Sequence, residues 1–483
     1  MAVSDPVHVR NLIGGAFRAP AGERLRAIVD PASGATIAQA RDASTGDVDD
    51  AVRAAVAAGR GWAECTPAER ADALLRLAAV VEQNDDELAA IEQRNVGKPG
   101  QVAALEPALT VDVLRFFAGA ARVMEGVAAG EYTRDVTTMV RRDPVGVVGC
   151  IVPWNYPLST AAAKFAPALA AGNTVVVKPS ELTPLSLLRL CELAEDVLPP
   201  GVLNVVVGDG ATAGARLAAH PGVAMISMTG SPRAGRLIAA AAAPTMKRLH
   251  LELGGNAPVV VFPDADVDAL AQTLRLASFW NSGQECGAAA RVLVHRDAAA
   301  TVRDALAEMI ESVAVGAPDD EEVEVGPVVS AAQRTRLADL VGGAVRAGAS
   351  TAGTRRALPD EGFYVAPTLV WDVEQSDPIV QQETFGPVIT LQQFGDEDEA
   401  IALANGTPYG LSGSIWSADV ARGLRLARTL RCGTTWINTH MVASLELPWG
   451  GLGDSGGGRD ASIYALEDHT IARNVSVALG SPS

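Results

Sequence analysis

The chain has 483 residues, of which 48% are hydrophobic and 20% are charged, and its 57 acidic and 39 basic side chains give a formal net charge of −18. This length allows about two to four domains with large cores, and the composition excludes a disordered or fibrous protein. An acidic chain lacks the basic face of a general nucleic-acid binder, so we expect no nucleic-acid partner. Five scattered cysteines do not form a disulfide framework, which favours a reducing compartment.

The N-terminal segment MAVSDPVHVRNLIGG has no long apolar run, so no signal peptide is predicted. Residues 145–163 carry no charge, but they include two prolines and several polar side chains that would leave backbone groups unpaired in lipid. We interpret this stretch as a buried strand, a turn and a helix. We therefore expect a soluble, cytoplasmic protein without a membrane partner.

Residues 45–125 read as helical, and a second helix is predicted to begin after Thr66, an N-cap residue followed by Pro67. Beyond residue 145, short Val-rich runs alternate with Ala- and Leu-rich helices. The predicted strands are 147–152, 174–177, 202–207 and 223–227, and the predicted helices are 158–171, 183–196, 211–219 and 232–242. Continuous apolar strands separated by helices indicate βαβ units and a parallel sheet covered on both faces.

A second αβ series begins at 258–262 and continues through predicted strands near 292–294 and 390–394, with the glycines at 254 and 255 as the expected seam. Residues 350–362 are predicted to form a polar surface loop. Residues 130–143 and 470–479 alternate in the manner of a two-stranded ribbon. Such ribbons are marginal alone in water, so we expect this one to pair with another subunit.

Cys286 lies in the segment FWNSGQECG, between two glycines that let backbone amides approach a bound atom. A thiol is a strong nucleophile once it is ionised. Most cysteines are nevertheless inert and buried, and spacing alone does not separate Cys286 from the others, which are Cys65, Cys150, Cys191 and Cys432.

Glu252 and Asn155 are the other candidate catalytic residues. Glu252 ends an apolar strand before two glycines, where partial desolvation would raise its pKa and suit it to general-base work; an interface carboxylate paired with an arginine is the alternative. Asn155 lies in PWNYP, where two prolines hold its amide in place to donate to an oxyanion, whereas an ordinary Asx turn is the alternative.

Three glycine-rich or charged turns suggest an anionic cofactor. Residues 208–214 are one residue away from a Rossmann fingerprint, and residues 229–235 follow a strand and open a helix, whose amides form an anion site. Lys178 and Glu181 follow a strand, and an acid there accepts from ribose hydroxyls and repels a 2′-phosphate, which favours NAD over NADP. A plain charge at a helix N-terminus is the alternative.

The six histidines show no ligand spacing and neither CxxC nor HExxH occurs, so we expect no catalytic metal. No G-x-S-x-G motif occurs, which argues against a serine hydrolase.

In order and combination, the motifs resemble those of the aldehyde dehydrogenase superfamily over essentially the whole chain. They are PWNYP (153–157), KPSE (178–181), TGSPRAG (229–235), LELGG (251–255), GQEC (283–286), ETFGPV (383–388) and PWGG (448–451). The resemblance implies that Cys286 attacks an aldehyde carbon, that Asn155 and the Cys286 backbone N–H stabilise the oxyanion, and that Glu252 activates the water that hydrolyses the thioester. It also implies a place for Lys164 on a proton-exit path.

By the same resemblance, NAD is the cofactor, with NADP disfavoured. Lys178 and Glu181 then hold the adenosine ribose, Ser231 the pyrophosphate, and Glu383 the nicotinamide ribose with Phe385 beside it. The full implied cofactor set is Trp154, Lys178, Ser180, Glu181, Gly214, Gly230, Ser231, Gly235, Leu253, Glu383 and Phe385.

The implied fold class is α/β. It comprises a Rossmann-like NAD-binding domain (1–121 and 145–254), an αβ catalytic domain (255–462) and a small β oligomerisation ribbon (122–144 and 463–483). The implied assembly is a homo-oligomer, either a dimer or a tetramer.

Finer resemblance, in 112–132, 140–148 and 436–470, is to γ-aminobutyraldehyde dehydrogenases, followed by betaine and other ω-aminoaldehyde dehydrogenases. A cationic substrate needs acids and aromatic faces around it. Candidate acids are Glu285, Glu446 and Asp112, and candidate aromatic walls are Tyr156, Trp280 and Trp449; the alternative for each acid is a surface carboxylate.

Two positions depart from the family pattern and leave the exact substrate open: Gly453 replaces a usual lysine, and Ala163 replaces a frequent aromatic residue. The alternatives within the same mechanism are dehydrogenases for betaine aldehyde, succinic semialdehyde or a general aliphatic aldehyde. A thiol esterase with the same Cys and base, and a non-catalytic relative, are the alternatives from other classes.

Overall fold

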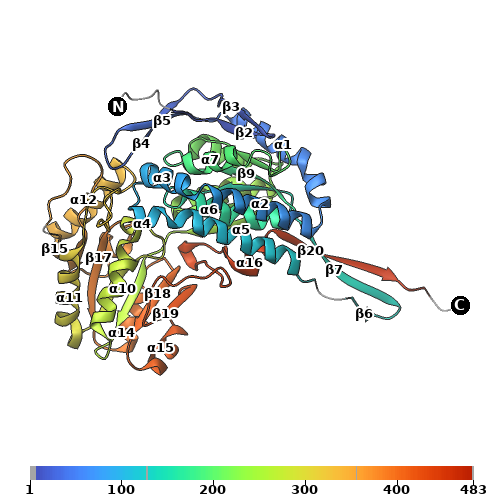
Figure 1. Ribbon diagram of the computed structural model, residues 1–483. Helices are drawn as coiled ribbons and strands as arrows, with labels where there is room; N and C mark the ends of the chain where they lie inside the picture. Colours follow the sequence, from blue (N-terminus) through green and yellow to red (C-terminus); the bar gives the residue numbers. More distant parts are fainter. Residues whose placement is uncertain (1–6, 127–128, 355, 481–483) are drawn as a thin grey trace.

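The Val-rich runs of the first half form a seven-stranded sheet in the computed structural model, which describes residues 7–126, 129–354 and 356–480 (Figure 1). Its order is β12-β11-β8-β9-β10-β2-β3, with the first five strands parallel and the last two antiparallel. The strands are β2 (Asn11–Ile13), β3 (Ala16–Arg18), β8 (Val147–Ile151), β9 (Thr174–Lys178), β10 (Leu203–Val205), β11 (Met225–Gly230) and β12 (Arg248–Leu253). All four strands predicted for this region are therefore confirmed.

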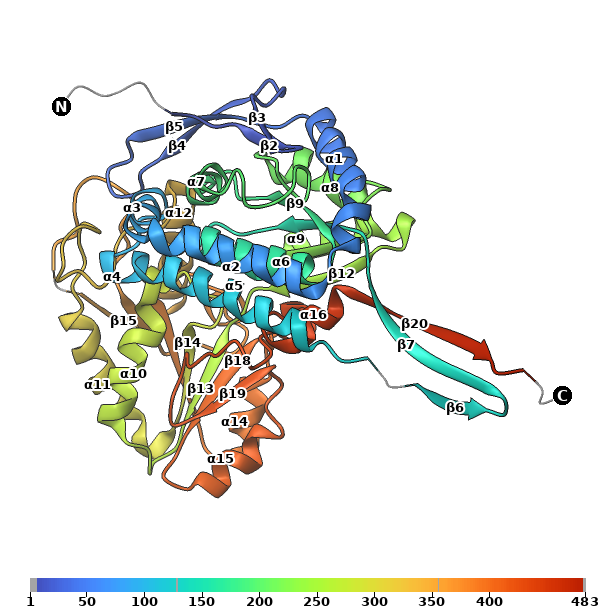
Figure 2. The ribbon, with the colours of Figure 1, turned by 45° about the vertical axis from the view of Figure 1, so that its right-hand side comes forward.

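Helices cover both faces of this sheet, as continuous apolar strands require. One core joins α2, α5, α6 and α7 to the sheet, and a second joins α1, α8 and α9 to its other face; Figure 2 shows α2 and α5 side by side across the first face. The helices of this half are α1 (Thr45–Glu64), α2 (Pro67–Gln83), α3 (Asp85–Val96), α4 (Gly100–Ala103), α5 (Leu105–Val123), α6 (Pro157–Ala170), α7 (Leu185–Leu193), η1 (Gly210–Gly214), α8 (Ala215–Ala219), α9 (Pro232–Ala242) and η2 (Ala243–Thr245).

The predicted start of α2 is confirmed by its cap. The Glu69 N–H donates to the Thr66 hydroxyl at 3.3 Å, and the Glu69 carboxylate accepts from the Thr66 N–H at 2.7 Å. This reciprocal pair satisfies two backbone donors that the first turn leaves open.

The second half forms another seven-stranded sheet, in the order β15-β16-β17-β14-β13-β18-β19, parallel except for β15. Its strands are β13 (Ala257–Val261), β14 (Ala289–His295), β15 (Ser350–Gly353), β16 (Thr368–Trp371), β17 (Val388–Phe394), β18 (Ser412–Trp416) and β19 (Thr434–Ile437). The helices are α10 (Val267–Phe279), η3 (Trp280–Gly283), η4 (Arg296–Ala298), α11 (Ala299–Ser312), α12 (Ala331–Ala347), α13 (Pro378–Gln381), α14 (Glu397–Ala404), α15 (Val420–Ala427) and η5 (Gly453–Ser455).

The prediction of a loop over 350–362 is wrong at its start, because β15 pairs with β16 there. This edge strand reads Ser-Thr-Ala-Gly and is partly exposed, so it has neither the apolar run nor the alternation that marks a strand.

A ribbon projects from the body and contains β6 (Gly130–Thr133), β7 (Val136–Pro144) and β20 (Thr470–Ala478) (Figure 1). The two-stranded ribbon predicted for 130–143 is confirmed, since β6 and β7 pair antiparallel. The second segment pairs with it in the same chain, because β20 and β7 run antiparallel from Thr470 opposite Pro144. The predicted ribbon range 463–483 also takes in most of α16 (Ser462–Asp468), which instead packs on α5 and α6. A further small sheet joins β1 (Val7–His8), β5 (Thr36–Arg41) and β4 (Leu25–Val29).

In the described part of the chain, no helix combines the length and apolar character needed to cross a membrane.

A buried ionic cluster joins α3, α5 and the loop before α6. The Lys98 ammonium lies 2.8 Å from a Glu92 oxygen and 2.5 Å from a Glu106 oxygen, and all three side chains are fully buried. The other Glu106 oxygen accepts from the Ser159 N–H at 2.8 Å, and the Lys98 ammonium lies 4.5 Å from the centre of the Tyr156 ring. Through these contacts the cluster fixes the position of the loop that carries Asn155.

We expect Lys98→Met to lower the free energy of unfolding by about 3–5 kcal/mol, because it leaves buried carboxylates without their cation. The exposed pair Arg115–Glu82 supplies a matched control, and Arg115→Met should cost about 0–1 kcal/mol. Urea titrations followed by circular dichroism measure both. Equal losses for the two variants would contradict a stabilising role for the buried cluster.

Candidate active site

The carboxyl ends of the parallel strands of the first sheet lie along one edge of that sheet. The turn before β14 lies against this edge. Asn155, Lys178, Gly230 and Leu253 lie at or just beyond the ends of β8, β9, β11 and β12. An ideal Cβ on Gly255, two residues after β12, would lie 2.3 Å from the Cys286 carbonyl oxygen. The carboxyl edge of an open α/β sheet is where ligands bind, and here it carries the candidate nucleophile of the other sheet.

Cys286 follows a turn of unusual backbone conformation. Asn281, Ser282 and Gly283 have φ values of 49°, 58° and 71°. Left-handed non-glycine residues cost about 1–3 kcal/mol each and cluster at functional sites. The turn is fixed by hydrogen bonds from the Ser282 hydroxyl to the Gly326 carbonyl and from the Val329 N–H to the Gln284 side chain.

Asn155 lies against this turn. Its side-chain amide donates to the Gln284 carbonyl at 3.0 Å, and the Asn281 amide donates to the Asn155 carbonyl at 3.2 Å. Because an amide nitrogen carries two hydrogens, Asn155 keeps one for a ligand beside Cys286. A free amide hydrogen can donate to an oxyanion, which is the role predicted for Asn155.

The Cys286 thiol donates to a Glu285 carboxylate oxygen at 3.2 Å, and the Gly287 N–H donates to the same oxygen at 3.3 Å. Burial, followed by the charges of Glu285, Glu383 and Glu252, raises the pKa of Cys286 well above its usual range. The resting thiol is therefore protonated. The buried Cys150 and Cys191 are also protonated, since burial raises the pKa of each to about 12.

Glu252 is 3% exposed, and neither of its carboxylate oxygens has a hydrogen-bond partner among the described residues. Burial, followed by the charge of Asp460, raises its pKa well above the usual range, while Lys164 opposes the shift. Gly450 makes room for the side chain, because a Cβ there would lie 2.5 Å from a Glu252 oxygen. A buried, unpartnered carboxyl group of raised pKa is suited to accept a proton from water.

A chain of charged groups runs from the neighbourhood of Glu252 to the surface. The Lys164 ammonium is fully buried and lies 2.8 and 2.7 Å from the two Asp460 oxygens. His250 joins Asp460 at 2.9 Å through Nε2 and Asp468 at 3.1 Å through Nδ1, and the Asp468 side chain is 47% exposed. His250 and Glu252 are two residues apart on β12, so their side chains share one face.

The predicted cofactor residues form two groups. Around the end of β9, the Lys178 ammonium lies 3.6 Å from Glu181 and donates to the Pro179 and Gly208 carbonyls, while Gly214 packs against its stem. The Ser180 hydroxyl accepts from the Leu182 N–H.

Around the start of α9, Ser231 is the N-cap and accepts from the Ala234 N–H at 3.3 Å, so the first turn presents its remaining amides outward. Gly235 packs on Leu253, where a Cβ would lie 2.7 Å from the leucine side chain. Gly230 likewise leaves no room for a side chain, because Met228 fills that space.

On the side of the second sheet, a Glu383 oxygen accepts from the Gly255 N–H at 2.9 Å, and burial raises the pKa of Glu383 to about 7. The Trp154 and Phe385 rings meet edge to face at 5.1 Å. Together with the buried, unpartnered Thr229 hydroxyl before α9, these groups fit a dinucleotide that spans the edge of the first sheet.

The predicted substrate residues are less closely grouped. Trp449 lies over Gly287, where a Cβ would lie 2.9 Å from its ring, and Trp280 is half-buried at the start of the strained turn. Burial and the Glu285 charge raise the pKa of Tyr156 well above its usual range, so its hydroxyl is neutral. Glu446 is exposed and accepts from the Ser444 hydroxyl, and Asp112 is exposed on α5.

The two departures from the family pattern have local explanations. Gly453 has φ +60°, and a Cβ there would lie 2.8 Å from the Pro408 carbonyl oxygen, so a lysine would be strained. The half-buried Ala163 lies next to Lys164 on α6.

Sequence reasoning missed several residues that shape the site. His440 donates to the Gly287 carbonyl at 2.9 Å and accepts from the Ser414 hydroxyl; it is neutral, because burial lowers its pKa to about 4. Asp460 was also missed. His250 could have been found, because it precedes Glu252 by two positions on a predicted strand.

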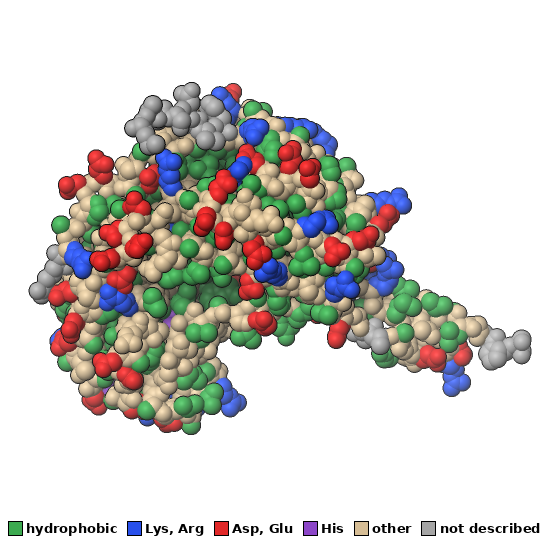
Figure 3. Space-filling model, in the orientation of Figure 1, with side chains coloured by type: hydrophobic (Ala, Val, Ile, Leu, Met, Phe, Trp, Pro, Cys, Tyr) green, Lys and Arg blue, Asp and Glu red, His purple; other side chains and the backbone are tan. Residues whose placement is uncertain are grey.

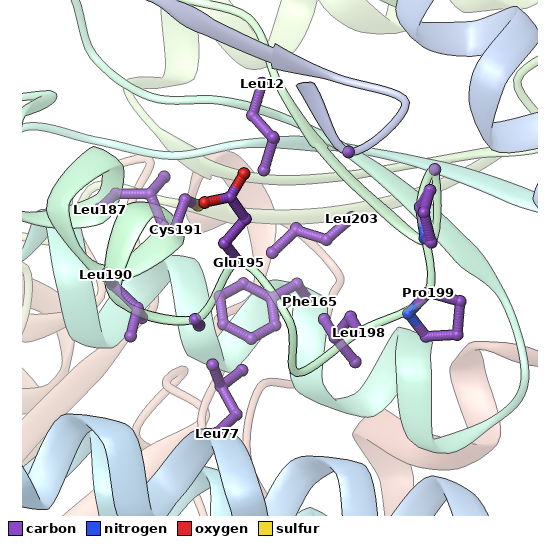
Figure 4. A pocket seen from close by; sticks show the side chains of 14 residues that line it. Leu12, Leu77, Phe165, Leu187, Leu190, Cys191, Glu195, Leu198, Pro199 and Leu203 are labelled. Atoms are coloured by element: carbon purple, nitrogen blue, oxygen red, sulfur yellow. The ribbon is translucent and has the colours of Figure 1, made fainter. Parts of the chain in front are cut away.

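A separate apolar pocket lies between α2, α6, α7 and the start of β10. Its walls include Leu77, Phe165, Leu190 and Leu203, with the Cys191 and Glu195 side chains at one side (Figure 4). None of the predicted site residues lines it.

Comparison with known proteins identifies the family of the chain. The sequence profile of the aldehyde dehydrogenase family matches residues 17–475. The chain belongs to this family. As an aldehyde dehydrogenase, the protein is an NAD(P)-dependent oxidoreductase that acts on aldehyde groups, and the predicted α/β fold is confirmed.

Three solved structures illustrate the similarity. A candidate aldehyde dehydrogenase from Burkholderia cenocepacia is 41% identical, with a TM-score of 0.94 over 98% of this chain and 100% of that chain. PnpE from Pseudomonas sp. WBC-3 is 39% identical, with a TM-score of 0.95 over 99% of each chain. A betaine aldehyde dehydrogenase from Staphylococcus aureus, solved with NAD+, is 32% identical, with a TM-score of 0.95 over 98% of each chain.

The raised pKa of Glu252 gives a pH prediction. A general base works only when deprotonated, so we expect kcat to rise about tenfold per pH unit until the pH passes that pKa. Steady-state NADH formation across a pH series measures this. Glu252→Gln should keep a first burst of NADH and lose later turnover by about 10²–10⁴-fold, whereas the exposed Glu321→Gln should change neither. A flat pH profile would contradict the assigned role.

Proposed function

We propose that this aldehyde dehydrogenase oxidises a cationic aldehyde, an ω-aminoaldehyde such as 4-aminobutanal, to the carboxylate with NAD. The observation that carries this proposal is the acidic lining around the nucleophile: a Glu285 carboxylate oxygen lies 3.2 Å from the Cys286 sulfur, and Glu383 also contributes to the raised pKa of the thiol. Negative potential in a water-poor site attracts a cationic substrate and repels an anionic one. Succinic semialdehyde is therefore the weaker candidate.

In the proposed reaction, Cys286 attacks the aldehyde carbon and the free hydrogen of the Asn155 amide stabilises the oxyanion. A bound NAD, which Glu383 and Phe385 would hold on the side of the second sheet, would supply the acceptor for the hydride of the thiohemiacetal carbon. Glu252 takes a proton from the water that hydrolyses the Cys286 thioester. The Lys164–Asp460 pair, with His250 and Asp468 behind it, provides a route for that proton to solvent.

Betaine aldehyde is a second candidate, supported by the similarity to the Staphylococcus enzyme. Aromatic rings bind quaternary ammonium groups. Trp449 lies over Gly287, with the Trp436 ring at 6.2 Å from it, so aromatic faces are available close to Cys286.

NAD is favoured over NADP by Glu181. Its carboxylate is partly exposed beside Lys178, where it accepts from ribose hydroxyls and repels a 2′-phosphate. All five cysteines are free thiols, which supports a reducing compartment such as the cytoplasm.

A panel of aldehydes tests the proposal. The expected kcat/KM order places 4-aminobutanal and 3-aminopropanal above hexanal and succinic semialdehyde by on the order of 10–100-fold, since one charge interaction of about 1.5–3 kcal/mol is at stake. NADH or NADPH absorbance is the readout, with NAD and NADP in parallel and Cys286→Ala as the control.

A preference for succinic semialdehyde or hexanal would overturn the substrate class and leave the mechanism intact. A preference for betaine aldehyde selects the second candidate. Ester hydrolysis without any aldehyde oxidation would select the thiol esterase.

We also propose that the ribbon binds a second copy of the chain. Exposed apolar side chains occur along it, among them Tyr132 at 77%, Val477 at 47% and Leu479 at 55% exposed. Figure 3 shows hydrophobic side chains around the hollow between the ribbon and the body. Apolar surface on a projecting ribbon is typical of an interaction site.

Val477→Asp should shift the protein from dimer or tetramer toward monomer, because a charge would be buried in the interface. Leu424→Asp, on the exposed face of α15, is the matched control and should leave the assembly unchanged. Sedimentation velocity measures both. A wild-type monomer at micromolar concentration would count against the proposal.

A further inference from the structure

The nucleophile Cys286 is joined to its neighbour Glu285 by a side-chain hydrogen bond. The Cys286 thiol donates to a Glu285 oxygen at 3.2 Å, and the Gly287 N–H fixes that oxygen from the other side at 3.3 Å. No other hydrogen bond from this sulfur occurs among the described residues. The thiol proton of the resting enzyme therefore already points at a carboxylate.

Glu252 is not placed to take this proton directly. Its oxygens have no hydrogen-bond partner among the described residues, and its nearest charge interactions are with Asp460 and Lys164. The pKa of Cys286 lies well above its usual range, so little thiolate exists before substrate arrives. The proton must then leave the sulfur while the new bond forms, and the acceptor must be within hydrogen-bond reach.

We propose that Glu285 is a catalytic residue that accepts the Cys286 thiol proton during attack on the aldehyde. The S–H bond breaks and its proton moves to Glu285 as the S–C bond forms, and the carbonyl electron pair moves to the oxygen beside Asn155. The proton later passes from Glu285 to solvent, so the carboxylate is regenerated. This assignment rests on the proposed function and separates two bases: Glu285 for acylation and Glu252 for hydrolysis.

The same geometry argues against Glu285 as the ligand of a substrate ammonium group. A carboxylate 3.2 Å from the sulfur lies next to the reacting carbon. In an extended 4-aminobutanal the ammonium group lies about four bonds from that carbon, which at about 1.3 Å per bond is roughly 5 Å away.

Glu285→Gln tests the proposal with two readouts that move in opposite directions. Alkylation of Cys286 by iodoacetamide should become faster near neutral pH, because losing a negative charge lowers the thiol pKa. The pre-steady-state burst of NADH should slow by about 10²-fold or more, with 4-aminobutanal and with hexanal alike, because the acylation base is gone. The exposed Glu321→Gln is the matched control and should leave alkylation and both bursts unchanged.

Each other result overturns the assignment. A burst that slows with 4-aminobutanal but not with hexanal makes Glu285 an ammonium ligand. If alkylation and both bursts slow together, Glu285 only supports the local structure.

If the wild type forms no NADH with any aldehyde, the proposed function fails by itself. The burst of p-nitrophenol from p-nitrophenyl acetate, which needs no cofactor, then tests Glu285: it should slow in Glu285→Gln and persist in Glu252→Gln, and an unchanged burst in Glu285→Gln rejects the proposal.

Discussion

Two glycines at the seam between the sheets are the constraint on which the active site depends. Strand β12 ends at Leu253 and β13 begins at Ala257, so Gly254 and Gly255 carry the chain from one sheet directly into the other. A Cβ on Gly254 would lie 2.2 Å from a Glu383 oxygen, and one on Gly255 would lie 2.3 Å from the Cys286 carbonyl oxygen. Backbone therefore takes the place of side chains where cofactor and nucleophile residues converge, and a side chain at Gly255 would displace the backbone at Cys286.

Before substrate binds, the surroundings of Cys286 and Glu252 disfavour the ionised forms that the reaction needs. Burial, and after it the charges of neighbouring carboxylates, raises the pKa of both Cys286 and Glu252, so the protonated and unreactive form of each group is favoured. This makes the free enzyme poorly reactive toward adventitious electrophiles. A cationic substrate would relieve part of the repulsion when it binds, so the same charges that protect the thiol would help to select the aldehyde that activates it.

The sequence predicted most strands and the principal site residues, because both are local features. Strands β8 and β13 contain no polar side chain apart from a thiol, and β9 has three consecutive valines. The candidate catalytic residues lie in motifs that resemblance identifies. Contacts between polar residues far apart in the chain could not be predicted: Lys164 meets Asp460 across 296 positions. Neither the Lys98 cluster nor the His250–Asp468 contact has a local signature, since periodicity shows which face is buried but not which charges meet there.

Helix α16 determines when the core under the first sheet can be completed during synthesis. Its Ala465 and Leu466 complete the core that α5 and α6 form under the first sheet, and the His469 carbonyl accepts from Asn173 at 2.9 Å. N-terminal domains commonly fold while the ribosome is still adding residues. Here the core on this face of the first sheet is complete only once residues 465 and 466 have been made, so a nascent chain that lacks them leaves apolar surface on α5 and α6 uncovered.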